Sequence, residues 1–416
     1  MDAEAGFSET TLGGILALQA LVLSFLSSFG GLLADELEKR TKHGRILTMK
    51  IGISVGTFSV LMIGVGSHLF FKDKSSPLGL APILYYTILR LLYALSLSMI
   101  LPVMDGITLV YLQLEGKDKS FFGKERLYGA ITWALAHIIM GPALDLWGFK
   151  AMYFFAFISW IFCLLVFQLY TYGIDELKKA NSCGETLPLK LGNIKNDKSD
   201  KMKEKDERIQ DEERGSSKNS IIIIITAMFG TMYGMGFVFS KFTLNMGTSV
   251  VEQLIFLFFN YLGSSNTMCG LTVAVTVMFE IPIFEYAPEM LRRFGLGILL
   301  QISSLAYIVR VVGYSLIPKK YPALVLLLEP LHGVTYACSK ASGVEFAAKY
   351  SPKGYEASGQ GILSIFSGAG NCLGVLLGGI LEDKFGSRIM YRCFATIVAI
   401  GATFFASAQF KNKHEI

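Results

Sequence analysis

The sequence predicts an all-α protein that lies in a membrane and is built from two related bundles of helices. Of its 416 residues, 52% are hydrophobic and only 17% are charged, whereas a soluble domain carries about a quarter charged residues. Apolar stretches of about 20 residues, enough to cross a hydrocarbon core of roughly 30 Å, recur along the whole length. Two short sequence patterns also occur once in each half of the chain. Lipid is therefore the expected solvent for much of the surface.

The first half is predicted to contain five membrane spans, and the second half six. The first five lie at about 10–33, 46–71, 82–112, 126–145 and 149–171. The remaining six lie at about 220–262, 267–288, 295–316, 321–349, 356–381 and 388–409.

Between the two sets of spans lies a polar stretch that is dense in Lys, Glu, Asp and Ser and lacks aromatic residues. Such a composition cannot bury enough apolar surface to fold. We therefore expect a flexible cytoplasmic linker here, with a small folded insert as the alternative. The predicted organisation is an N-terminal bundle (1–172), the linker (173–219), a C-terminal six-helix bundle (220–410) and a short cytoplasmic tail (411–416).

Basic residues predict which loops face the cytoplasm. They are concentrated in the linker, in the loops 36–50 and 114–126, and in the tail. The net charge of +5 lies in these loops, so it indicates topology and not nucleic-acid binding. No signal peptide is evident, because the first apolar run follows an acidic start. The spacing of the six cysteines fits neither a disulfide framework nor a zinc site, and no cofactor motif is visible.

Two patterns repeat in the same order on either side of the linker. The longer one, Gly141-x-x-x-Asp145-x-Trp147-Gly148-x-Lys150-x-Met152-Tyr153, recurs as Gly379-x-x-x-Asp383-x-Phe385-Gly386-x-Arg388-x-Met390-Tyr391. The shorter one, Gly6-x-Ser8-x-Thr10-x-x-Gly13, recurs as Gly263-x-Ser265-x-Thr267-x-x-Gly270. Two homologous helical halves joined by a linker are typical of transporters whose repeats are related by an axis along the membrane normal.

The repeat also predicts an irregularity. In the second half the Gly263 pattern follows a membrane segment, whereas only five residues precede Gly6. We therefore expect about eleven spans, with the first half lacking its opening helix. The stretch 220–262 would extend about 60 Å as one helix, which is long for a span. We expect one long, kinked segment there, because a hairpin would invert the second half.

One loop resembles a signature of the major facilitator superfamily, the loop between its second and third helices. The residues are Gly31-x-Leu33-Ala34-Asp35-x-x-x-Lys39-Arg40. The resemblance implies that Asp35 accepts hydrogen bonds from neighbouring helix ends and latches the cytoplasmic gate. Glu36 and Glu38 depart from the usual pattern, which has a basic residue and a Gly at these positions.

A second segment is similar to the fifth helix of lactose permease and of the wider branch that contains nucleoside symporters and major facilitator domain-containing protein 6-like proteins. It reads Lys124-Glu125-Arg126-Leu127-Tyr128-Gly129-Ala130-Ile131-Thr132-Trp133. The resemblance implies that Arg126 binds solute hydroxyls, that Asp105 is the partner acid, and that Trp133 stacks on a ring. Simple packing of Trp133 is the equal alternative.

Ionisable residues inside the spans cost roughly 2.5–3.5 kcal/mol each, so each needs a partner or a purpose. The candidates are Asp105, Arg126, Glu252, Glu280, Glu285, Arg310, Glu329 and Glu345, together with His137 and His332. In lactose permease a His and a Glu share a face of the tenth helix, with an acid on the eighth and an Arg on the ninth. By this resemblance Glu329 would carry a proton, with His332 beside it, Arg310 would drive its release, and Glu280 would link proton to solute. A static ion pair is the alternative.

Small residues form a stripe on a helix of the second half. Gly370, Gly374 and Gly378 repeat every four residues, which permits close approach of another helix. Static packing is the favoured interpretation, and a sliding surface between moving parts is the alternative.

The hypothesis from the sequence is a secondary active transporter, not an enzyme, that moves a small sugar- or nucleoside-like solute by alternating access with protons. It would act as a monomer in the bilayer, and neither the plasma membrane nor an organelle membrane is favoured. The alternative is a membrane receptor or regulator that retains the fold without transporting.

Overall fold

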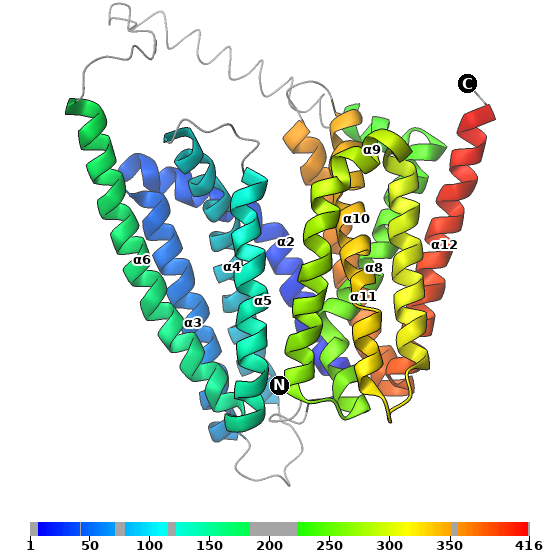
Figure 1. Cartoon of the computed structure of the whole chain (residues 1–416), viewed down its shortest axis with the longest axis horizontal. Coiled ribbons are helices and arrows are strands. Elements are labelled where there is room, and N and C mark those ends of the chain that lie inside the picture. The colour runs from blue at the N-terminus through cyan, green and yellow to red at the C-terminus, as the bar shows by residue number, and fades with distance from the viewer. Residues whose placement is uncertain are drawn as a thin grey trace, which may run out of the picture.

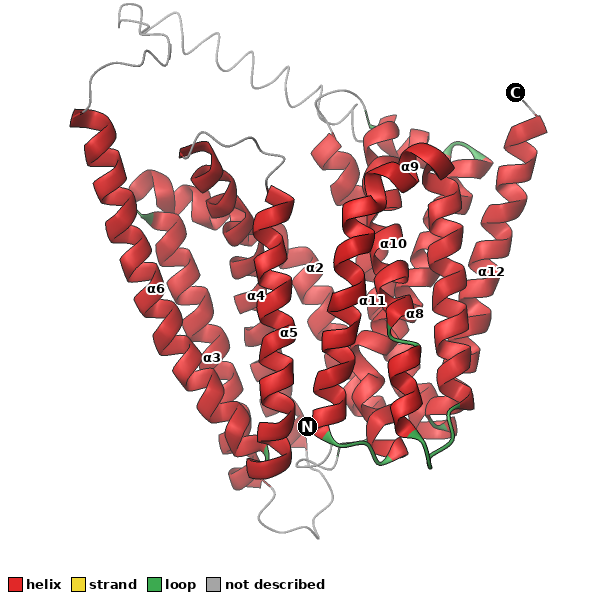
Figure 2. Cartoon of the chain, viewed as in Figure 1, coloured by secondary structure: helices red, strands yellow, loops and turns green. Residues whose placement is uncertain are grey.

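A computed structural model describes residues 7–41, 43–70, 80–114, 122–183, 223–351 and 356–414. The described chain is helical throughout, with one 3₁₀ segment and no strand within these ranges (Figure 2). Nine of the described helices are long and apolar enough to cross a membrane. The predicted all-α membrane fold is thereby confirmed, while the predicted number of spans stays a prediction.

Five long helices form the first half of the molecule. They are α2 (Glu9–Arg40), α3 (Gly44–Phe70), α4 (Leu80–Leu114), α5 (Phe122–Trp147) and α6 (Phe149–Cys183). The Ser8 hydroxyl caps α2 by accepting a hydrogen bond from the backbone N–H of Thr11. At the other end of this half, α6 runs to Cys183, past the predicted start of the linker at residue 173.

The second half begins with a short helix over 223–229. It continues with α8 (Met232–Leu262), α9 (Asn266–Leu316), the 3₁₀ segment η2 (Pro322–Leu327), α10 (Pro330–Lys349), α11 (Glu356–Phe385) and α12 (Ser387–His414). The helical conformation is interrupted at Gly230 and Thr231, and α8 then runs as one helix of 31 residues. This confirms the prediction of one kinked segment in place of a hairpin.

The helix α9 consists of two arms that turn back on each other at Gly295, whose φ of 76° lies in the left-handed region that favours glycine. Thr276 and Arg310 are 34 positions apart along α9, yet both donate to the same oxygen of Glu329. A straight helix would separate them by about 50 Å. The two arms correspond to the spans predicted at 267–288 and 295–316, and Figure 1 shows them side by side.

The large apolar core lies in the second half, where α8 is surrounded by α9, α10, α11 and α12. The exterior is apolar as well. On α6, for example, Phe162 and Leu169 are 65% and 72% exposed. Large apolar side chains on the outside of a long helix are stable in contact with lipid, whereas their exposure to water is unfavourable.

The two halves meet along two helix pairs, α2 with α11 and α5 with α9. In each pair the two helices come together at the face of the molecule where α2 and α9 begin (Figure 1). We call this the distal face. The ribbons of the halves diverge toward the opposite face, which we call the linker face because α6 ends there at Cys183.

Candidate functional site

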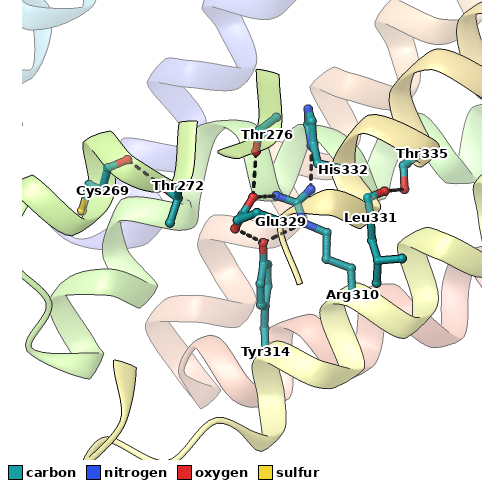
Figure 3. A network of polar contacts seen from close by, with 9 residues as sticks. All are labelled: Cys269, Thr272, Thr276, Arg310, Tyr314, Glu329, Leu331, His332 and Thr335. Carbon is teal, nitrogen blue, oxygen red and sulfur yellow. Dashed lines mark hydrogen bonds and ion pairs between the residues drawn. The ribbon is translucent and has the colours of Figure 1, made fainter. Parts of the chain in front are cut away.

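A buried carboxylate is at the centre of the most extensive polar network of the second half. Glu329 is 1% exposed, and both of its oxygens accept hydrogen bonds. Oε2 accepts from Arg310 Nη2 at 2.8 Å and from Thr276 Oγ1 at 2.9 Å, while Oε1 accepts from Tyr314 OH at 2.6 Å (Figure 3). The charge of Glu329 is thus matched by an arginine and two hydroxyls, as a buried ion requires.

Arg310 extends the network because all three nitrogens of its guanidinium form hydrogen bonds. It is 3% exposed, and it donates through Nε to Tyr314 OH at 2.7 Å. Its Nη1 lies 2.6 Å from Nδ1 of His332. Because a guanidinium can only donate, Nδ1 must be the acceptor, which places the imidazole hydrogen on Nε2. The His332 ring stacks on Tyr336 with centroids 6.0 Å apart and planes at 8°.

Local sequence explains where Glu329 lies. The span predicted at 321–349 is not one continuous helix, and this prediction was wrong. The segment η2 ends at Leu327, and α10 begins at Pro330 because proline lacks the N–H that an interior helical residue donates. Glu329 therefore lies at the N-cap of α10, just before the helix. Its αR backbone still aims it, with His332, at Arg310.

Two further carboxylates lie within electrostatic range of this network. Glu252 on α8 interacts with the charges of Arg310 and Lys340, and Glu280 on the first arm of α9 interacts with Glu252. The backbone at Glu280 also packs closely on α10, where a Cβ on Gly333 would come within 2.8 Å of the Glu280 nitrogen. The structure thus brings Glu280, Arg310, Glu329 and His332 into one region of the second half.

The site residues predicted in the first half lie on α4 and α5. Asp105 on α4 is half-buried. Trp133 on α5 is 60% exposed, and its ring contacts that of His137 with centroids 4.6 Å apart. Arg126 belongs to α5, but its side chain lies outside the described residues. The solute-binding roles of these residues stay predictions.

The predicted gate residues lie at the linker-face end of α2. The side chain of Asp35 lies outside the described residues, whereas the backbone of Gly31 is part of α2. Lys39 and Arg40 form exposed ion pairs with Glu36, at 3.9 Å and 3.0 Å. Glu38 accepts a hydrogen bond from the backbone N–H of Arg45 at 2.9 Å, near the start of α3. The two acids that depart from the family pattern therefore both have partners in this turn.

Sequence reasoning missed three residues that the structure shows to be important. Thr276 and Tyr314 complete the shell of Glu329, and Tyr314 could have been found because it lies one helical turn after Arg310. Lys241 on α8 is buried and donates to the backbone oxygen of Ser339 at 2.6 Å and to the Ser339 hydroxyl. It could have been found as a charge within a predicted span. Among the described residues, no cluster of His, Cys, Asp or Glu could hold a metal ion.

Comparison with known proteins agrees with this architecture. The sequence model of the MFS_1 like family matches residues 2–393. The "Uncharacterized transporter YwbF" of Bacillus subtilis (strain 168) is 23% identical over 416 residues, which cover 99% of this chain and 88% of that protein.

Two solved structures show that the fold is shared with transporters. The nucleoside transporter NupG (D323A mutant) superposes with a TM-score of 0.66 at 16% identity, covering 98% of this chain and 93% of that one. A POT family transporter in complex with 5-aminolevulinic acid gives a TM-score of 0.64 at 13% identity, covering 97% and 88%. The chain belongs to the MFS_1 like family and is a multi-pass membrane transporter with the major facilitator fold.

Proposed function

We propose that this transporter moves a small polar solute, nucleoside- or sugar-like, by alternating access, and that it couples this movement to protons through Glu329. The observation that carries the proposal is the Arg310–Glu329 pair, which is buried within a helical bundle in lipid. Ionisable residues at such depth are costly, and they mark ion and proton pathways in transporters.

Glu329 is suited to carry a proton because its environment can exist in two forms. In this structure Arg310 supplies a counter-charge to Glu329, and Arg310, Tyr314 and Thr276 all donate hydrogen bonds to it. If Arg310 moves toward another acid, Glu329 is left buried without its counter-charge, and it should take up a proton. Glu252 is an acid close enough to interact with the charge of Arg310, and Glu280 in turn interacts with Glu252.

The solute is proposed to bind between the halves and to engage Glu280 from the second half. Asp105, Arg126 and Trp133 would contribute from the first half, as the resemblance of α5 implies. Binding of the solute to Glu280 would then alter the charges around Arg310 and so link solute to proton. Labelled nucleosides should be the first probes in proteoliposomes, because NupG is a nucleoside transporter with this fold, and sugars should follow.

Exchange and net uptake in the Glu329→Gln variant test the coupling role. Glutamine keeps the shape and accepts hydrogen bonds, but it cannot cycle a proton. We expect solute-driven exchange to continue at a near wild-type rate, while net uptake driven by a pH gradient falls at least about tenfold. A variant that loses both activities equally, or neither, would show that Glu329 is only a structural partner of Arg310.

The matched control is Glu345→Gln. Glu345 is on α10 like Glu329, but it is exposed. The same change there should leave both exchange and net uptake as in the wild type. A loss of net uptake in this control would mean that the assay responds to any acid on α10, and the assignment to Glu329 would not stand.

A further inference from the structure

The end of α5 binds the beginning of α9 across the boundary between the two halves. Asp145 Oδ1 accepts from the backbone N–H of Asn266 at 2.8 Å and from its side-chain amide at 2.9 Å. Asp145 Oδ2 accepts from the backbone N–H of Thr267 at 2.9 Å and from its hydroxyl at 2.5 Å. One carboxylate from the first half thus takes four hydrogen bonds from the first turn of a helix in the second half.

Glycines allow the two helices to come close enough for these bonds. A Cβ on Gly141, one turn before Asp145, would lie 2.7 Å from the backbone oxygen of Asn266. A Cβ on Gly270 would overlap the backbone oxygen of His137. Side chains at either glycine would push α5 and α9 apart, so the backbone contact and the carboxylate contact depend on each other.

The same contact is formed a second time with the halves exchanged. Asp383 at the end of α11 accepts a hydrogen bond from the Thr10 hydroxyl, in the first turn of α2, at 2.5 Å. Gly379 packs on Gly13, where an added Cβ would lie 2.8 Å from the Gly13 Cα. These residues are the repeat counterparts of Asp145, Thr267, Gly141 and Gly270. Residues of the two repeated sequence patterns therefore form the contacts that join the halves.

The chemistry of both contacts is that of an acid at a helix N-terminus, where unpaired backbone N–H groups and the helix dipole favour negative charge. The two contacts differ in strength. Asn266 donates to Asp145 through its backbone N–H and through its side-chain amide, whereas its counterpart near Asp383 is Glu9, whose carboxylate side chain cannot donate and repels another carboxylate. Asp145 and Asp383 are exposed, so water can replace these bonds when the helices separate.

We propose that Asp145 and Asp383 are two clasps that hold the transporter closed at its distal face, and that the α5–α9 clasp is the stronger. The structure is then the state in which this face is shut. Opening requires that the carboxylates leave the starts of α9 and α2. The inference rests on the alternating access proposed above, but its test measures distances between helices and needs no solute.

The test is a pair of distance measurements between spin labels on the full chain in lipid nanodiscs, with the native cysteines replaced. Labels at Lys150→Cys and Lys320→Cys report the distal face, and labels at Thr41→Cys and Lys349→Cys report the linker face. Asp145→Ala should lower the ratio of the population at the short distal distance to the population at the long one at least about tenfold, because charge-assisted hydrogen bonds are lost. Asp383→Ala should have a smaller effect, and Asp145→Asn, which keeps one acceptor oxygen, an intermediate one.

A control and the linker-face labels separate gating from damage. Glu289→Ala removes an acid from the linker-face end of the first arm of α9, and it should leave the distal distance unchanged. If Asp145→Ala leaves it unchanged too, or broadens both distances as unfolding would, the clasp is rejected. Lengthening at the distal face with shortening at the linker face supports both the clasp and alternating access. Lengthening at the distal face alone supports the clasp and rejects alternating access.

Discussion

At the scale of residues, the burial of Glu329 depends on how completely its oxygens are satisfied. The Tyr314 hydroxyl has a double role, since it accepts from Arg310 and donates to Glu329. It therefore connects the acid and the base at a second point besides their direct ion pair. Removing one partner of a buried charge costs more than the bond itself, because the remaining group stays desolvated.

Tyr314→Phe tests this double role. We expect a loss of about 1–3 kcal/mol in stability, because the substitution leaves Glu329 Oε1 and Arg310 Nε without partners. The check is thermal unfolding of the detergent-solubilised protein. The matched control is Tyr307→Phe on the same arm of α9, since the Tyr307 ring is buried as deeply but its hydroxyl has no hydrogen-bond partner among the described residues. Equal losses in both variants would contradict the role given to Tyr314.

At the scale of elements, α11 shows how one helix can serve both halves of the molecule. The stripe of Gly370, Gly374 and Gly378 packs on α8, within its own half. A Cβ on Gly370 would lie 2.7 Å from the backbone oxygen of Phe242. Gly368 and Gly379 instead approach α2 of the other half. The stripe faces α8, which belongs to the same half, and not α2. This orientation supports the interpretation of static packing over that of a sliding surface between the halves.

Gly374→Ala is expected to destabilise the second half. The added Cβ would overlap the backbone oxygen of Met246, and this oxygen cannot move without shifting α8. Overpacking of this kind costs about 1–3 kcal/mol, which should appear as a lower unfolding temperature. Gly361→Ala is the control, because a Cβ at Gly361, also on α11, meets no described residue within 4 Å. An unchanged unfolding temperature for Gly374→Ala would show that α8 and α11 are not held this closely.

At the scale of the whole molecule, the contacts between the halves are concentrated at the distal face, and the ribbons diverge toward the linker face (Figure 1). A transporter that alternates needs a second set of contacts to close the other face. The resemblance of residues 31–40, which form the end of α2, assigns that role to Asp35, which would act when the distal clasps are open. The two sets of contacts would then exclude each other, which is the physical basis of alternation.

Asp35→Asn tests this division of roles. We expect transport to slow several-fold, because a neutral amide interacts more weakly with a helix N-terminus than a carboxylate does. The amount of protein in the membrane should not change. The measurement is initial uptake normalised to membrane level, with Glu289→Gln as a control, because Glu289 is an acid of the linker face that pairs with Arg292 and Arg293 of its own helix. Wild-type turnover in Asp35→Asn would show that Asp35 is not a latch in this chain.

The sequence by itself determined the all-α membrane fold and the positions of the long helices, because lipid imposes a length and a composition on every span. It also singled out Arg310, Glu329 and His332, because charges in apolar segments are rare enough to notice. The break between η2 and α10 was missed, although Pro330 is a local signal for the start of a helix.

Only the tertiary structure decided which residues meet. Thr276 and Arg310 converge on Glu329 because α9 turns back at Gly295, and no pattern along the chain specifies how two arms are aligned. The repeat showed that Asp145 and Asp383 are equivalent, but not that each binds the half to which it does not belong. Periodicity within a helix records which face is apolar, whereas partners between helices are selected by packing in three dimensions.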